Sequence, residues 1–252
     1  MKKTVSLVLL LAVLLALCAC GETDVSAPDT DRDGETVTFT DSCGRVVEIS
    51  KNISRIAPAG SVATMFLASV APEMLCCLGS DIFENQQQYL DERISALPVT
   101  GQLYGGKSTL NMEALLAAAP QLIIDMGDRK GDVSDGLDGL QAQVGVPCIF
   151  IESDLDSMAA AFRTLGSLLN GKAERCEALA AFVEETLALA EENRAKIPEN
   201  ERMSVMYTSG SDGLGTNARG SSQAQVLELV GAENAIEVEK VTGKGGGDLI
   251  NM

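Results

Sequence analysis

Short apolar strands that alternate with helical patterns constrain the fold of this 252-residue chain more than any other feature. Between residues 53 and 151, apolar runs of four or five residues recur, and an amphipathic pattern follows most of them. Strands of this kind are typical of a parallel sheet that helices cover on both faces, so the pattern predicts an α/β protein. The predicted strands are Ile53–Ala57, Met74–Leu78, Leu122–Asp125 and Cys148–Ile151, and the predicted helices between them are Val62–Ser69, Asn111–Ala119 and Gly136–Val144.

Other patterns precede and follow this region. Thr36–Thr40 and Arg45–Ile49 alternate in polarity on either side of a short polar segment, which predicts a β-hairpin. Near the C-terminus, Met203–Tyr207 predicts a strand. Ser222–Val230 predicts a helix that opens with Ser222 as the first residue of a capping box and ends at Gly231.

One predicted helix is unusually long. Leu155–Leu169 has the spacing of an ordinary amphipathic helix, but Ala173–Lys196 predicts about 24 helical residues, hence roughly 36 Å, before Pro198. A helix of that length is poorly suited to one small lobe. The roughly 230 residues after residue 19 suffice for two small lobes, each with its own core.

The first twenty residues indicate export. Lys2 and Lys3 precede the sixteen-residue apolar run Val5–Cys20, which is shorter than the roughly 20 residues of a membrane span. Leu17–Gly21 resembles the lipobox of bacterial lipoproteins. We therefore expect Cys20 to be lipidated and to anchor the mature chain to a membrane outside the cytosol. A plain secretory signal or a transmembrane anchor is the alternative interpretation.

The charge of the chain makes nucleic acid an improbable class of partner. The sequence has 19 basic and 36 acidic residues, a net charge of −17. Loss of residues 1–19 removes only Lys2 and Lys3, which leaves 17 basic residues and a net charge of −19. Because nucleic-acid binding depends on basic patches, a chain of this charge repels phosphate backbones.

The chain contains no histidine, which excludes Ser-His-Asp and Cys-His catalysis and every His-ligated metal site. We predict no enzyme, cofactor or metal site, although paired carboxylates as acid and base stay possible because Asp and Glu are abundant. An incomplete calcium-loop pattern over Asp29–Thr40 has Thr40 where a bidentate Glu is required. Five cysteines follow Cys20, without a C-x-x-C pair: Cys43, Cys76, Cys77, Cys148 and Cys176.

Gly101–Ser108 satisfies the nucleotide-binding pattern G-x-x-x-x-G-K-[ST]. Leu122–Asp125 resembles a strand that ends at a magnesium-binding carboxylate. A nucleotide-binding loop must follow a buried strand, however, and only Leu97–Thr100 precedes the pattern, with Pro98 inside it. An exported protein also meets no ATP. Nucleotide binding is therefore the weaker interpretation.

Six segments, taken in order, resemble the iron-siderophore, haem and cobalamin class of ABC-transporter substrate-binding proteins. The resemblance covers residues 36–252 and occurs in a chain with a lipoprotein signal. No single segment is specific, but all six occur in the family's order. They are Thr38–Arg45, Arg55–Pro58, Leu110–Glu113, Ala119–Ile124, Gly145–Pro147 and Gln225–Asn234.

The resemblance implies two Rossmann-like lobes with parallel sheets, joined by one long helix, with the ligand in the cleft between the lobes. Ala173–Lys196 is similar to that helix. The implied divisions are a signal peptide over 1–19, a flexible linker over 20–35, an N-terminal lobe over 36–170, the inter-lobe helix over 171–197 and a C-terminal lobe over 198–252.

In this family the loops that follow the strands line the cleft. On this basis Tyr104 and Tyr207 would stack on a planar ligand, and Arg129 and Arg219 would pair with its anionic groups. A tyrosine at the rim and a solvated arginine are the plainer interpretations. The cleft positions that the resemblance implies are Asp81, Phe83, Tyr104, Met126, Arg129, Tyr207, Ser209, Asn217 and Arg219.

The resemblance also implies a partner. One glutamate on each lobe engages arginines of the ABC permease in this family, and the matching positions are Glu113 and Glu228. A favourable helix dipole at Glu113 and a solvated side chain at Glu228 are the alternatives. The implied cargo is a ferric siderophore, haem or a corrinoid. A lipoprotein of the same fold with a non-transport role, such as sensing, is a second possibility.

Two similar segments of the sequence predict how much of the second lobe this chain contains. Gly105–Met112 and Gly245–Met252 agree at four of eight positions. In the first half this segment leads into a helix and a buried strand, the equivalents of which would follow Met252. We therefore expect the second lobe to be incomplete in this chain.

Overall fold

The computed structural model describes residues 35–103, 109–129, 131–209, 212–238 and 249–251. The signal, Cys20 and nearly all of the predicted linker lie outside these ranges. By its contacts the chain divides into residues 1–32 and residues 33–252, and all the described elements belong to the second unit. Within the described ranges, no helix combines the length and apolarity that a membrane span requires. The lobe boundaries at 36, 171 and 198 stay a prediction.

Three parallel strands form the central sheet, in the order β3 (Ile56–Pro58), β4 (Leu122–Gly127) and β5 (Cys148–Glu152). Ile56 lies opposite Leu122, and Ile124 lies opposite Ile149. This arrangement confirms the predicted α/β class. The three strands run in the same direction, so their carboxyl ends meet at one edge.

Helices cover both faces of the sheet because successive strand residues point to opposite sides. Ile124 and Ile149 pack with α2, α7 and α8, whereas Ile123 and Phe150 pack with α5 and α6. The nearly continuous apolar residues of β4 and β5, apart from Asp125, Gly127 and Glu152, therefore follow from the two buried faces. The helices are α2 (Ser61–Val70), α5 (Met112–Ala117), α6 (Val133–Val144), α7 (Met158–Leu168) and α8 (Ala173–Arg194).

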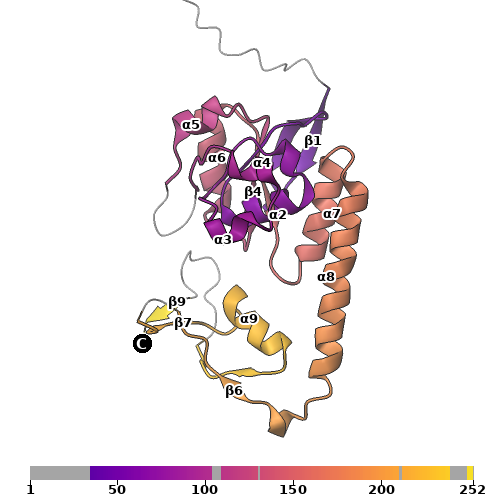
Figure 1. Cartoon of the computed structure of the whole chain (residues 1–252), viewed down its shortest axis with the longest axis vertical. Coiled ribbons are helices and arrows are strands. Elements are labelled where there is room, and N and C mark those ends of the chain that lie inside the picture. Colours follow the sequence, from indigo (N-terminus) through magenta and orange to yellow (C-terminus); the bar gives the residue numbers. More distant parts are fainter. Residues whose placement is uncertain (1–34, 104–108, 130, 210–211, 239–248, 252) are drawn as a thin grey trace, which may run out of the picture. The chain divides into compact units, whose positions relative to one another are not determined.

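The predicted long helix forms as α8, which has 22 residues and ends two residues before the predicted Lys196, and α7 packs against its first half (Figure 1). A Cβ added to Gly166 would lie 2.9 Å from the Cβ of Cys176, so only glycine permits this close approach of the helices. On the exposed side, Arg163 donates hydrogen bonds to Glu177 and Glu184 of α8. Each of these carboxylates has its pKa lowered, chiefly by the hydrogen bond from Arg163.

The predicted hairpin forms from β1 (Thr36–Thr40) and β2 (Val46–Ser50), and Asp41 attaches it to the sheet. Oδ1 of Asp41 accepts hydrogen bonds from the backbone N–H of Cys43 and Arg45, both at 2.9 Å. Oδ2 accepts from the Arg45 guanidinium at 3.0 Å and from the Phe150 N–H at 3.2 Å. The Asp41 side chain is fully buried, so this ion pair holds the hairpin on β5.

The C-terminal elements are short. β6 (Ser204–Val205) pairs in parallel with β8 (Glu233–Asn234), and β7 (Gly215–Asn217) pairs antiparallel with β9 (Leu249–Asn251). Helix α9 (Ser222–Leu229) contacts α8.

The ends of α9 test two predictions. Its N-cap is Ser221, whose Oγ accepts from the Ala224 N–H, so the capping role predicted for Ser222 is wrong. The cap lies one residue earlier because only there does the hydroxyl meet a free N–H of the first turn. At the other end, Gly231 has φ +86° and donates to the Glu228 carbonyl, which confirms the predicted stop.

The strand predicted over Met74–Leu78 does not form. Pro72–Met74 is a 3-10 turn, η1, and Leu75 and Leu78 make only isolated bridges. Cys76 and Cys77 consequently pack in the same apolar cluster. A hydrogen bond with Cys77 and burial raise the pKa of the Cys76 thiol. The sequence patterns also missed the short strands β7, β8 and β9 and the short helices α3 (Glu84–Gln87), α4 (Glu92–Ser95) and η2 (Glu199–Glu201).

We expect Asp41→Asn to lower the free energy of unfolding by about 3 kcal/mol, because the Arg45 guanidinium would lose its buried charged partner and keep only the exposed Asp138. The matched control is Asp138→Asn. Asp138 pairs with the same arginine but is exposed, so its loss should cost less than about 1 kcal/mol. Urea unfolding followed by circular dichroism measures both. Equal losses would show that burial of the Asp41 pair is unimportant.

Candidate functional site

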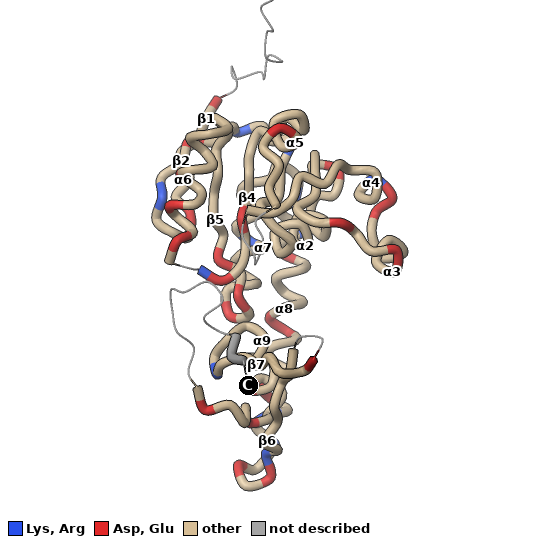
Figure 2. The backbone as a smooth tube through the Cα atoms, turned by 90° about the vertical axis from the view of Figure 1, so that its left-hand side faces the viewer, with Lys and Arg blue, Asp and Glu red and all other residues tan. Residues whose placement is uncertain are grey.

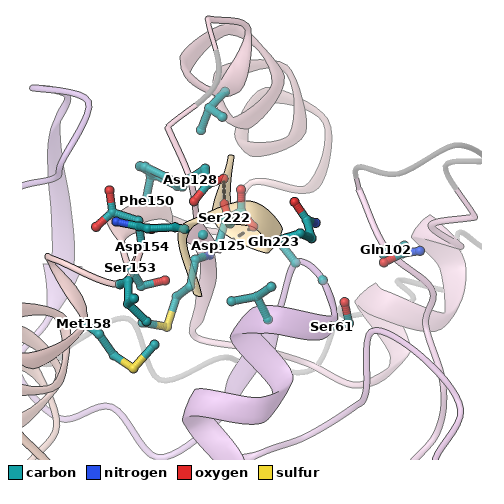
Figure 3. Close-up of a pocket in the computed structure, with 18 residues that line it drawn as sticks. Ser61, Gln102, Asp125, Asp128, Phe150, Ser153, Asp154, Met158, Ser222 and Gln223 are labelled. Carbon is teal, nitrogen blue, oxygen red and sulfur yellow. Dashed lines mark hydrogen bonds between the residues drawn. The ribbon is translucent and has the colours of Figure 1, made fainter. Parts of the chain in front are cut away.

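A cavity of about 450 Å³ lies at the carboxyl edge of the β3-β4-β5 sheet, and we name it the strand-end cavity (Figure 3). Ligands of parallel α/β sheets bind at this edge, where the loops after the strands converge. Three such loops and the first turn of α9 form the wall. It comprises Ala59, Gly60, Ser61, Val62, Gln102, Asp125, Met126, Gly127, Asp128, Val133, Phe150, Ser153, Asp154, Leu155, Met158, Ser222, Gln223 and Gln225.

Backbone hydrogen bonds beyond the strand ends hold these loops. The Ala59 N–H donates to the Ile124 carbonyl at 2.9 Å, and the Ser153 N–H donates to the Gly127 carbonyl at 3.0 Å. Gly127 has φ +142°, a backbone conformation that glycine adopts readily and other residues rarely adopt. The parallel pairing therefore continues for one residue after β3 and β5 and fixes where the polar loop residues begin.

Three carboxylates, those of Asp125, Asp128 and Asp154, carry the charge of the wall, beside serine and glutamine side chains. Asp128 accepts a hydrogen bond from Ser222, the first residue of α9, and Figure 3 shows the pair near Asp125. Oδ1 of Asp154 accepts from the N–H and the hydroxyl of Ser157, at 2.8 and 2.6 Å. Among the described lining residues none is Lys, Arg or His. Segments before and after α8 thus contribute to one acidic wall.

Ser153 carries the clearest sign of a ligand. Its side chain lines the cavity and the residue is only 6% exposed, yet its Oγ has no hydrogen-bond partner among the described residues. A buried hydroxyl without a partner costs about 1–3 kcal/mol. A polar group of a bound ligand would remove that cost. Met126, Phe150 and Met158 supply apolar surface beside it.

Of the residues predicted for the N-terminal side of the cleft, Met126 lines the strand-end cavity. Asp81 and Phe83 line a second cavity instead. The Arg129 guanidinium donates to the Ser42 carbonyl at 3.1 Å and lines neither of these two cavities. Tyr104 lies outside the described residues. The ligand-binding role of all five stays a prediction.

The residues predicted for the C-terminal side lie behind the wall or away from it. The buried Asn217 donates to the side chain of Gln223, a wall residue, at 3.4 Å. Arg219 donates to the Asn234 carbonyl at 3.5 Å. The Tyr207 carbonyl accepts from Thr216, and Ser209 pairs with Gly215 through the backbone. None of these four lines either cavity within the described structure, and their roles also stay a prediction.

Several wall residues were missed because the sequence analysis did not weigh every strand end. Polar residues within four positions of a predicted strand end were the available signal: Ser61 follows Ile53–Ala57, and Ser153 and Asp154 follow Cys148–Ile151. Asp125 was considered only as a magnesium ligand. Ser222 and Gln223 carried no signal, because their approach to the sheet depends on the chain beyond α8.

Two other site types find no support. Within the described ranges no cluster of three or more Cys, Asp or Glu side chains could hold a metal ion. A nucleotide-binding loop opens a helix directly at its Lys-Ser step. Here α5 begins only at Met112, and Thr109 and Leu110 are not helical. Asn111 caps the helix, because its side-chain oxygen accepts from the Ala114 N–H at 3.1 Å. Residues 104–108 of that pattern lie outside the described residues.

A family model described as periplasmic binding protein matches residues 67–252. The chain belongs to this family. The predicted resemblance to ABC-transporter substrate-binding proteins is thereby confirmed, and so is the α/β fold with parallel sheets and a long helix. A comparison with curated proteins found no match.

Solved structures of periplasmic binding proteins share this fold. An ABC transporter solute-binding protein from Sulfurospirillum deleyianum is 25% identical, with a TM-score of 0.69 over 82% of this chain and 65% of that one. Molybdate-bound MolA from Haemophilus influenzae is 16% identical, with a TM-score of 0.68 over 86% and 69%. The haem-binding protein HmuT is 22% identical, with a TM-score of 0.54 over 86% and 67%. This chain thus spans about two thirds of each structure.

We expect Ser153→Ala to leave the free energy of unfolding unchanged or to raise it by up to about 1 kcal/mol, because it removes a buried hydroxyl that has no partner in the described fold. The control is Ser157→Ala, which removes the 2.6 Å hydrogen bond from the Ser157 hydroxyl to Asp154, keeps the one from the N–H, and should cost about 1–2 kcal/mol. Urea unfolding compares the two variants. A loss at Ser153 as large as that at Ser157 would mean that the fold itself uses the Ser153 hydroxyl.

Proposed function

We propose that this periplasmic binding protein captures a ferric siderophore, haem or a corrinoid and delivers it to an ABC permease. The observation that carries the proposal is the composition of the strand-end cavity. Its wall joins Asp125 and Ser153, which precede α8, to Ser222 and Gln223, which follow it. A ligand in that cavity would touch segments on both sides of the long helix, as expected of a cleft between two lobes.

The charge of the cavity wall limits the class of cargo that it would bind. Asp125, Asp128 and Asp154 line the cavity, and no Lys or Arg stands among the described lining residues. Arg129 and Arg219, which we expected to pair with anionic groups, donate to backbone carbonyls elsewhere. Because like charges brought together across an interface are costly, this wall favours a neutral or cationic cargo over an anionic one.

The family and the lipobox-like segment at the N-terminus together support a location at the outer side of a membrane. Members of the family act outside the cytosol, and we propose that Cys20 anchors this chain to the membrane through covalent lipid. Figure 2 shows acidic positions throughout the described chain, in keeping with its net charge of −17. A lipid tether rather than attraction to anionic lipid headgroups would therefore hold the protein at the surface.

We expect cyanocobalamin, which has no net charge, or the cationic ferrioxamine B to bind more tightly than haem, with a dissociation constant at least about tenfold lower. The reason is that the two propionates of haem would be repelled by the acidic wall. Titration of the full chain, followed by absorbance and calorimetry, measures all three. Ser153→Ala should weaken the tightest of them about tenfold, because the ligand loses its bond to that hydroxyl.

Molybdate and magnesium-ATP are the negative controls of the same titration, since neither is expected to bind. Binding of ATP that depends on magnesium and that Lys107→Ala abolishes would replace the receptor proposal with nucleotide binding. Failure of all three chelates to bind, in a chain that unfolds cooperatively, would refute the cargo proposal.

For the permease we propose that Glu113 and Glu228 are the docking residues. Glu113 is exposed in the first turn of α5, and Glu228 is half-buried in the last turn of α9. Neither lines the strand-end cavity or the second cavity. Carboxylates in these positions are able to meet basic side chains of a partner without touching the cargo.

We expect Glu113→Ala together with Glu228→Ala to reduce uptake of cargo by cells about tenfold, with unchanged cargo affinity and melting temperature. Glu174→Ala is the matched control, since Glu174 is an exposed first-turn glutamate of α8. Uptake of radiolabelled cargo by cells that carry each variant measures the effect. Normal uptake by the double variant would remove the docking role, and loss of cargo affinity would place these residues in the site.

A further inference from the structure

A second cavity, of about 540 Å³, lies between α2 and the segment that contains α3 and α4, and we name it the apolar cavity. Val62 and Met65 come from α2, and Phe83, Tyr89 and Ile94 come from the opposite segment. Asp81 and two serines are among its few polar lining residues. The cavity is therefore suited to a hydrocarbon or aromatic group.

Large apolar side chains are exposed around this cavity to an unusual degree. Phe83 is 69% exposed, Tyr89 is 83% exposed and Met65 is 61% exposed. The whole chain has only nine aromatic residues, three Tyr and six Phe, so two of nine stand exposed at one cavity. A cluster of exposed large apolar residues marks a surface that binds something.

The two cavities meet at the first turn of α2. Ser61 and Val62 line both of them. Gly60, the N-cap of α2, lines the strand-end cavity, and a Cβ added to it would meet no atom within 4 Å. A single small molecule that lies across this turn therefore reaches polar groups on one side and apolar side chains on the other.

We propose that the cargo has two parts and occupies both cavities. Its polar part lies in the strand-end cavity and bonds to the Ser153 hydroxyl, and an apolar or aromatic part lies across Val62 against Phe83 and Tyr89. The proposal rests on the proposed function and adds the class of ligand: an amphipathic molecule with an apolar arm. A compact polar ion such as molybdate would leave the apolar cavity unused.

The absence of tryptophan from the chain allows a direct test. Phe83→Trp places one indole at the apolar cavity, and Phe182→Trp places one on α8, away from both cavities, at a similar exposure of 65%. Each variant is titrated with cyanocobalamin and with ferrioxamine B. The accessibility of the indole to acrylamide is then measured by fluorescence quenching with and without cargo.

We expect bound cargo to reduce quenching of the Phe83→Trp reporter about threefold or more and to leave the Phe182→Trp reporter unchanged, because only the first lies under the apolar arm. We also expect Phe83→Ser with Tyr89→Ser to weaken cargo binding about tenfold, while Phe182→Ser leaves it within about twofold. These residues are exposed, so their replacement should not impair folding.

The outcomes separate the two proposals. If cargo binds but the Phe83→Trp reporter stays accessible, or if the paired serine variant keeps full affinity, the two-part cargo is refuted and the receptor function stands. If neither cyanocobalamin, ferrioxamine B nor haem binds the wild-type chain, both proposals fail.

Discussion

The parallel register of β3, β4 and β5 is the constraint on which the rest of the structure depends. Pairing of Ile56 with Leu122 and of Ile124 with Ile149 brings three carboxyl ends to one edge. These strand ends and the loops that follow supply all three carboxylates of the strand-end cavity, together with Ser61 and Ser153. A strand of opposite direction would carry its loop to the far edge, so the site exists because all three strands run the same way.

Two different interactions hold the elements that pack around this sheet. On one side the buried ion pair of Asp41 and Arg45 ties the hairpin to β5, through the N–H of Phe150 and the carbonyl of Cys148. On the other side Gly166 lets α7 lie close against α8 over an apolar face. The ion pair specifies position at a cost in desolvation, whereas the helix contact contributes burial without that cost.

The site combines features that a rigid apolar fold would avoid. It places three carboxylates and an unpaired buried hydroxyl around one cavity and leaves Phe83 and Tyr89 exposed beside it. The unpaired hydroxyl and the exposed aromatic side chains cost stability in the empty protein, and a ligand with a polar and an apolar part would offset both costs. In periplasmic binding proteins such features are expected at the cargo site rather than in the core.

The sequence alone determined the α/β class, the hairpin, the long helix and the family, because local periodicity and motif order record which faces are buried. It misplaced Met74–Leu78, since short apolar runs do not reveal whether a neighbouring strand is available to pair. Met126, which was predicted for the cleft, lines the strand-end cavity, whereas Ser153 and Ser222 line it and were not predicted. Only tertiary structure brings Ser222 to Asp128, 94 residues away, because the approach of α9 depends on packing and not on local pattern.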